Sequence, residues 1–311
     1  MKHPMSCGVF FVVAGLTFGQ VKIQREPIID VHLHSESLVD LQSWGPNPVT
    51  GKKAPVSVKE HIQQTLAEMD RYNIVLGIVS GSLEEVEKFR QYAPDRIWAG
   101  PYHGIPGLNI ESLRPLYQSG RLKIMGEVGA QYDGLDPSDP VLEPYFALAE
   151  ALDVPACIHM GGLGPPGITQ SVPKYRAALG NPLLLEEMLN RHPKLRLWIA
   201  HMGWPFLEET FAILSVYPQV YADISVSWVR GTREAFYSDL QEAIKQGFGT
   251  QIMFGSDQMT WPDGIGIAIE WIEQAGFLSA EQKREILYNN AARFLRLPPE
   301  QIAKHHEVLK K

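Results

Sequence analysis

Short apolar runs rich in β-branched residues alternate with longer amphipathic stretches along most of this chain, and this alternation limits the possible folds more than any other feature. Short apolar runs bounded by turn residues are typical of buried strands, whereas apolar residues at helical spacing predict helices. The predicted strands are Ile28–His34, Asn73–Ser80, Arg96–Gly100, Leu122–Val128, Pro155–His159, Leu195–His201, Val220–Ile224 and Gln251–Asp257. The predicted helices include Val58–Tyr72, Leu83–Tyr92, Val141–Leu152, Pro182–Arg191, Phe206–Tyr217 and Arg233–Lys245.

Strands that alternate with helices at this spacing imply parallel pairing through βαβ units. Eight such repeats without a break in composition favour an α/β fold with a single (β/α)8 TIM barrel over residues 20–311, and the length of 311 residues is ordinary for one barrel. A doubly wound sheet would need a glycine-rich phosphate turn after its first strand. Here that strand ends in His32-Leu33-His34, which argues against it.

Residues 1–19 differ in character from the rest of the chain. Lys2 gives a basic start, Val9–Phe18 is an almost unbroken apolar run, and Thr17 and Gly19 supply small residues before Gln20. This order predicts a secretory signal peptide over residues 1–19, and therefore a secreted or periplasmic location. The run is too short to span a bilayer, which needs about 20 apolar residues.

Charge and cysteine content narrow the function classes. The net charge is −7, from 28 basic and 35 acidic side chains, and no Lys/Arg cluster suits a phosphate backbone. Nucleic-acid binding is therefore not expected, and a small-molecule substrate is. Cys7 falls inside the predicted signal peptide and leaves Cys157 alone, so no disulfide framework is expected. The oligomeric state is left open, with a homo-oligomer as one option.

Two predicted connections are unusually long. Ser35–Ser57 follows the first strand and holds several Pro and Gly residues, and Gly161–Pro173 follows the fifth. A long connection inside a compact domain is usually functional, so we expect Ser35–Ser57 to form a lid over a site.

Unusual polar residues fall at the ends of the predicted strands. Asp30, His32 and His34 share one face of the first strand, because successive side chains alternate. In a TIM barrel the carboxyl ends of the strands converge on one mouth, where these enzymes place their chemistry. Such nitrogen and oxygen ligands predict a divalent metal, zinc by preference, with manganese, iron or cobalt as alternatives. The other residues of this set are Glu127 on the fourth strand, His159 on the fifth, His201 on the sixth and Asp257 on the eighth.

These motifs resemble a known family. His32-x-His34 is similar to the opening motif of the amidohydrolase superfamily. Ile199–Gly203 and Met253–Asp257 resemble the sixth- and eighth-strand motifs of its second family, which includes the aminocarboxymuconate-semialdehyde and resorcylate decarboxylases. Glu285–Phe294 resembles the closing helix of that family, and the resemblance covers nearly all of Ile28–Leu295.

The resemblance implies that His32, His34, His159 and Asp257 bind the main metal. It makes His201 either an acid/base residue or a ligand to a second ion. Gly126-Glu127-Val128-Gly129 departs from the decarboxylases and looks like the fourth-strand motif of TatD-type hydrolases, whose glutamate bridges two metals. One or two ions are therefore expected.

The leading hypothesis is a metal-dependent hydrolase that cleaves an ester, lactone or amide bond. A bound ion lowers the pKa of its water to about 7, and Asp257 would take the proton of that water. A non-oxidative decarboxylase or hydratase is the first alternative, and a secreted binding barrel without turnover is the second. We expect substrate to contact His103, Trp204 and Arg230. Further aromatic residues could form an apolar wall of the same site, namely Trp44, Tyr132, Trp228 and Trp261. The competing interpretation of all these residues is ordinary packing or surface exposure.

Overall fold

Parallel strands form the centre of the computed structural model, which describes residues 25–102, 107–162, 164 and 167–307. The strands pair in chain order, in one set from β1 to β3 and another from β4 to β8. Their bounds are β1 Ile28–His34, β2 Ile74–Gly81, β3 Ile97–Pro101, β4 Met125–Val128, β5 Ala156–Ile158, β6 Leu197–Ile199, β7 Val220–Asp223 and β8 Ile252–Met253.

Backbone hydrogen bonds close these two sets into one ring. Lys123 N donates to Ala99 O at 2.9 Å, which joins the approach to β4 to β3. Val31 N donates to Phe254 O at 3.0 Å, which joins β1 to the residue after β8. The fold is therefore the α/β barrel of (β/α)8 type that the sequence predicts.

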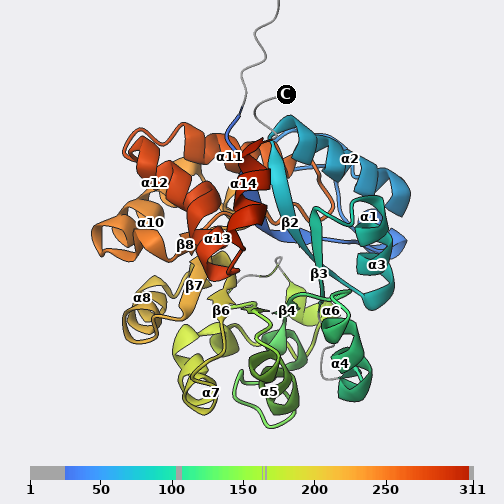
Figure 1. The fold of residues 1–311 in the computed structure, drawn as a ribbon, viewed down its shortest axis with the longest axis vertical. Helices are drawn as coiled ribbons and strands as arrows, with labels where there is room; N and C mark the ends of the chain where they lie inside the picture. The colour runs from blue at the N-terminus through green and yellow to red at the C-terminus, as the bar shows by residue number, and fades with distance from the viewer. Residues whose placement is uncertain (1–24, 103–106, 163, 165–166, 308–311) are drawn as a thin grey trace, which may run out of the picture.

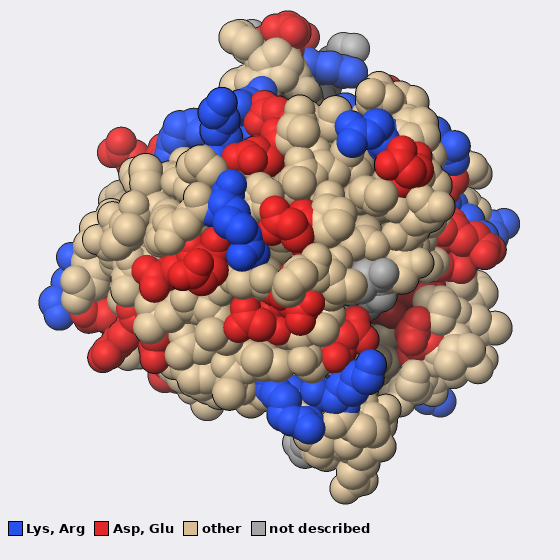
Figure 2. Space-filling model, turned by 90° about the horizontal axis from the view of Figure 1, so that it is seen from below, with Lys and Arg blue, Asp and Glu red and all other residues tan. Residues whose placement is uncertain are grey.

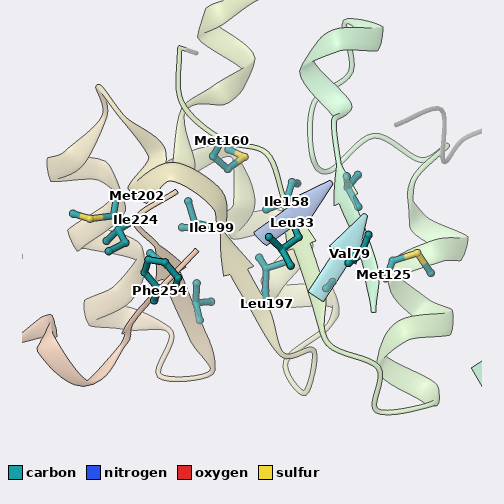
Figure 3. Packing of buried hydrophobic residues seen from close by; sticks show 14 of the residues in the cluster. Leu33, Val79, Met125, Ile158, Met160, Leu197, Ile199, Met202, Ile224 and Phe254 are labelled. Atoms are coloured by element: carbon teal, nitrogen blue, oxygen red, sulfur yellow. The ribbon is translucent and has the colours of Figure 1, made fainter. Parts of the chain in front are cut away.

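Helices surround the ring of strands (Figure 1). Buried strand residues such as Ile158 and Leu197 share a core with Phe146 and Met188 of the surrounding helices, and Figure 3 shows part of this packing. The helices are α1 Leu38–Ser43, α2 Val58–Arg71, α3 Leu83–Tyr92, α4 Ile110–Gln118, α5 Glu143–Ala151, α6 Ile168–Ser171, α7 Glu186–Arg191, α8 Leu207–Val216, α9 Ser227–Arg230, α10 Arg233–Lys245, α11 Gly264–Glu273, α12 Ala280–Arg284, α13 Asn290–Phe294 and α14 Pro299–Glu307, with a π-helical turn at Glu285–Asn289.

Several strands end earlier than the sequence suggests. The predictions ran to His201 on the sixth strand and Asp257 on the eighth, whereas β6 ends at Ile199 and β8 at Met253. His201 has φ 59° and Asp257 has φ 48°, and this left-handed backbone cannot continue a strand. On these two strands the backbone therefore stops pairing with its neighbours before it reaches the polar residue.

The C-terminal segment closes the end of the barrel at which the strands begin. Asn290 Nδ2 donates to the carbonyls of Gly249 and Ile252, which lie at the start of β8. Arg196 Nη1, before β6, donates to Phe294 O. Figure 1 shows α13 and α14 crossing in front of the strands, so the open mouth is the opposite end, where the strands finish.

The connection Ser35–Ser57 is not structureless. It contains α1, and it is tied to the segment after β8. Asn47 Nδ2 donates to Asp263 Oδ1 at 3.0 Å, and Trp261 Nε1 donates to Gly45 O at 3.0 Å. These contacts make it part of the rim of the mouth, and its movement as a lid stays a prediction.

Two other predictions concern the ends and the surface. The predicted signal peptide, residues 1–19, lies outside the described residues. Among the residues that the structure describes, no helix combines the length and apolar character that crossing a membrane requires. Acidic and basic side chains are interspersed on the face shown in Figure 2.

His61 of α2 gives a prediction about pH. Its Nε2 lies 2.7 Å from Met259 O, and burial lowers the pKa of His61 from 6.5 to about 4. Between these two pKa values His61 is protonated in the unfolded chain but neutral in the folded chain. The contribution of neutral His61 to stability is therefore complete above pH 6.5 and is lost as the pH falls toward 4. Between pH 6.5 and pH 4, the free energy of unfolding of the wild type should fall by about 3 kcal/mol more than that of His61→Gln, as measured by urea unfolding without metal. If the free energies of unfolding of the two proteins changed with pH in parallel, this role of His61 would be contradicted.

Candidate metal centre

Asp30 sets the first-strand histidines in place. Its side chain is fully buried, and its Oδ1 accepts hydrogen bonds from the backbone N of His32 and of Ser256, both at 3.0 Å. One carboxylate oxygen thus ties β1 to the segment after β8. Burial raises the pKa of Asp30 to about 7. His32 Nε2 and His34 Nε2 lie 3.1 Å apart, as the predicted strand alternation requires.

Glu127 lies between two groups of imidazoles. Its Oε2 is 3.2 Å from His32 Nε2 and 3.6 Å from His34 Nε2. Its Oε1 is 2.7 Å from His159 Nδ1 and 3.3 Å from His201 Nε2. The two oxygens of one carboxylate therefore face two different pairs of histidines.

Asp257 completes the group around His34. Its Oδ1 is 2.9 Å from His34 Nε2 and 3.9 Å from His32 Nε2, and its Oδ2 is 3.9 Å from His201 Nδ1. The Asp257 side chain is buried, and its Oδ1 pairs with His34 Nε2, which helps to lower the pKa of Asp257. A buried carboxylate oxygen beside an imidazole nitrogen is a common arrangement of two ligands of one cation.

Residues that sequence reasoning missed hold these histidines from outside. Asp223 Oδ2, at the end of β7, accepts a hydrogen bond from His32 Nδ1 at 2.9 Å. Gln258 accepts from His34 N at 3.0 Å and donates to His34 O at 2.8 Å. Asp223 carried a usable signal, because it is a carboxylate at the end of a predicted strand. Gln258 carried none beyond its place after Asp257.

The charges in this buried space balance one another. Burial by itself would lower the pKa of His32, but the carboxylates of Glu127, Asp223 and Asp257 raise it well above its ordinary value. Burial would raise the pKa of Glu127, but His32 and His159 hold it well below its ordinary range. Burial, together with the neighbouring charge of His159, lowers the pKa of His201 although Glu127 raises it. The carboxylates of Glu127, Asp223 and Asp257, whose pKa values are all lowered, are therefore ionised at neutral pH, which suits cation binding.

The donor set fits divalent cations. Imidazole nitrogens and carboxylate oxygens are typical ligands of zinc and related metals. Ligand atoms within 4.8 Å of one another occur in the groups His32–His34–Glu127, Glu127–His159–His201 and His32–His201–Asp257. Asp257 Oδ1, 2.9 Å from His34 Nε2, adds a further buried oxygen donor beside the first of these groups.

The other predicted site residues are less informative. Trp204 and His201 line the same small cavity. Tyr132 OH lies 3.4 Å from His159 Nε2, beside the cluster. Trp228 and Trp261 are almost fully buried and pack edge to face. These two residues of the predicted aromatic wall therefore serve ordinary packing. His103 and the side chain of Arg230 lie outside the described residues.

The family follows from comparison with known sequences. A family model described as Amidohydrolase matches residues 119–297, which is more than half of the chain. The chain belongs to this amidohydrolase family. Protein fluG of Emericella nidulans is 24% identical over 103 residues, which are 33% of this chain and 11% of that protein. The match thus spans about a tenth of that relative's length.

Solved structures share the fold at low identity. A probable 2-pyrone-4,6-dicarboxylic acid hydrolase from Acinetobacter baumannii has a TM-score of 0.63 and 18% identity, covering 87% of this chain and 99% of its own. A 4-oxalomesaconate hydratase from Rhodopseudomonas palustris has a TM-score of 0.60 and 16% identity, and the match covers 91% of this chain and 100% of that chain. A dihydroxybenzoic acid decarboxylase from Polaromonas, solved with manganese, has a TM-score of 0.58 and 15% identity, and the match covers 88% of this chain and 98% of that chain. Such identities establish the fold alone.

Gly255 tests how tightly the cluster is packed. A Cβ added there would lie 2.7 Å from His32 Cβ and 3.3 Å from atoms of Asp223 and Ser225. Gly255→Ala should therefore displace these side chains and lower the free energy of unfolding by about 1–3 kcal/mol, measured by urea unfolding without metal. Gly276→Ala is the matched control, because nothing lies within 4 Å of its added Cβ. Equal stability of the two variants would show that the packing around His32 is loose.

Proposed function

We propose that this chain is a metal-dependent hydrolase that cleaves an ester, lactone or amide bond of a small molecule at the mouth of the barrel. The observation that carries the proposal is the position of Glu127, whose two carboxylate oxygens face two separate pairs of histidines. Asp257 Oδ1 lies 2.9 Å from His34 Nε2, beside one of these pairs. Membership of the amidohydrolase family supports an enzymatic role.

The distances support two ion positions. His32, His34, Asp257 and Glu127 Oε2 would hold one ion, and Glu127 Oε1 would hold the other with two further histidines, His159 and His201. This division differs from the expected set, which placed His159 with His32, His34 and Asp257. The bridging role of Glu127 agrees with the TatD-type motif, although no comparison tests that detail. Zinc and manganese both suit these donors.

The chemistry needs two contributions. A divalent ion, when bound, supplies a Lewis acid that polarises the attacked oxygen and lowers the pKa of water to about 7. Asp257 supplies the proton transfer: the charges of His32 and His34 outweigh its burial and lower its pKa, so it is ionised at neutral pH. Asp257 receives the proton of the attacking water and delivers it to the leaving group.

A lyase is the second candidate. Among the similar structures, the decarboxylase and the hydratase match this chain about as well as the hydrolase does. The same residues suit that chemistry, with Asp257 delivering its proton to a carbon instead of a leaving group. Glu127 favours the hydrolase, because the decarboxylases as a group are expected to lack a glutamate at this position.

The remaining predictions rest on sequence alone. Export through residues 1–19 and substrate contacts by His103, Trp204 and Arg230 stay predictions, and of these three residues Trp204 lines a cavity together with His201. Zinc as the particular metal, a homo-oligomeric state and a binding barrel without turnover also stay open as predictions.

Turnover on a substrate panel separates the candidates. Metal-loaded protein should hydrolyse at least one member of a panel of esters, lactones and amides, and Asp257→Asn should lower kcat/KM by about 10²–10⁴-fold, the usual contribution of a proton-transferring group. Asp153→Asn is the matched control, because Asp153 pairs with Arg196 at the closed end of the barrel. CO2 release from aromatic carboxylates without hydrolysis would favour the lyase. No reaction in either panel would favour the binding barrel.

A further inference from the structure

Asp223 is the most heavily hydrogen-bonded carboxylate near the cluster. It is fully buried at the end of β7. Its Oδ2 accepts from His32 Nδ1 at 2.9 Å and from Trp198 Nε1 at 3.1 Å. Its Oδ1 accepts from the backbone N of His201 at 3.0 Å and of Ser225 at 2.9 Å. One side chain thus contacts both a first-strand and a sixth-strand histidine.

These contacts decide which nitrogen of His32 faces the cluster. An ionised carboxylate only accepts hydrogen bonds, so His32 Nδ1 carries the hydrogen. Its Nε2 then points to Glu127 Oε2, 3.2 Å away. A carboxylate behind a ligand histidine in this way fixes the ring orientation and commonly affects metal affinity.

Ser225 contacts the same two histidines. Its Oγ is 3.0 Å from His32 Nδ1 and 2.7 Å from His201 Nδ1. The two rings are 5.1 Å apart and tilted by 32°. Their outward nitrogens therefore share one hydroxyl, while their Nε2 atoms approach opposite oxygens of Glu127.

Trp198 links this arrangement to the closed end of the barrel. It lies on β6, is 1% exposed, and donates its indole N–H to Asp223. Its ring packs edge to face on Phe294 of α13, with centroids 5.6 Å apart. The indole is therefore fixed by the closing helix, and it fixes Asp223 in turn.

We propose that Asp223, Ser225 and Trp198 form a brace of positioning residues that holds His32 and His201 at a fixed separation and so couples the two ion positions. The proposal rests on the proposed function, because it treats both histidines as ligands. It assigns a role at the site to Trp198, which contacts His32 only through Asp223 Oδ2.

Two mild variants test the brace. Trp198→Phe keeps an aromatic ring against Phe294 but removes both the N–H donor and part of the ring volume, and Ser225→Ala removes only the hydroxyl. In calorimetric titration of metal-free protein with Mn²⁺, each should weaken binding by about 10–100-fold, the usual effect of losing a group that orients a ligand. The thermal midpoint of the metal-free protein should change little in Ser225→Ala and should fall in Trp198→Phe, because the smaller ring leaves a cavity at a buried position. Trp271→Phe, on α11, is the control and should bind Mn²⁺ as the wild type does.

Crystal structures of the metal-free variants supply a readout that needs no metal. The brace requires the His32 and His201 rings to shift relative to each other in Trp198→Phe or Ser225→Ala. Unmoved rings together with wild-type Mn²⁺ affinity would overturn it. If the wild type itself took up no Mn²⁺, the proposed function would fail, and the ring positions alone would still decide whether the brace exists.

Discussion

The crowding of imidazoles and carboxylates around Glu127 is the constraint on which the rest of the structure depends. His32 Nε2 and His34 Nε2 are 3.1 Å apart, and both side chains are buried beside ionised carboxylates. Burying so many ionisable groups costs free energy that their mutual attraction offsets only when each is held in good geometry. Nothing in packing an apolar core would select such a set, whereas binding of cations would.

The scaffold supplies that geometry through its topology. Parallel strands bring residues far apart in sequence to one rim, and the rim is rigid because the ring closes through Val31 and Phe254. The closing helix fills the other end through Asn290 and Phe294. Two of the functional residues, His201 and Asp257, follow the ends of their strands in the left-handed backbone conformation.

Sequence patterns predicted the fold and the residues that meet at the mouth, because both follow from periodicity and topology. β1 has the predicted bounds, and Glu127 lies with the predicted histidines. Sequence reasoning did not single out Asp223, although it is a carboxylate near the end of a predicted strand. It could not find Ser225 and Gln258, since a hydrogen bond across the barrel leaves no spacing signature. The division of the histidines into two pairs depends on side-chain distances that no motif contains.

Anomalous diffraction from crystals grown with Mn²⁺ tests the two-position metal centre most directly. Two peaks should flank the Glu127 carboxylate, one contacted by His32, His34 and Asp257 and the other by His159 and His201. No peak at the mouth, or a single peak bound by His159 together with His32, His34 and Asp257, would contradict it.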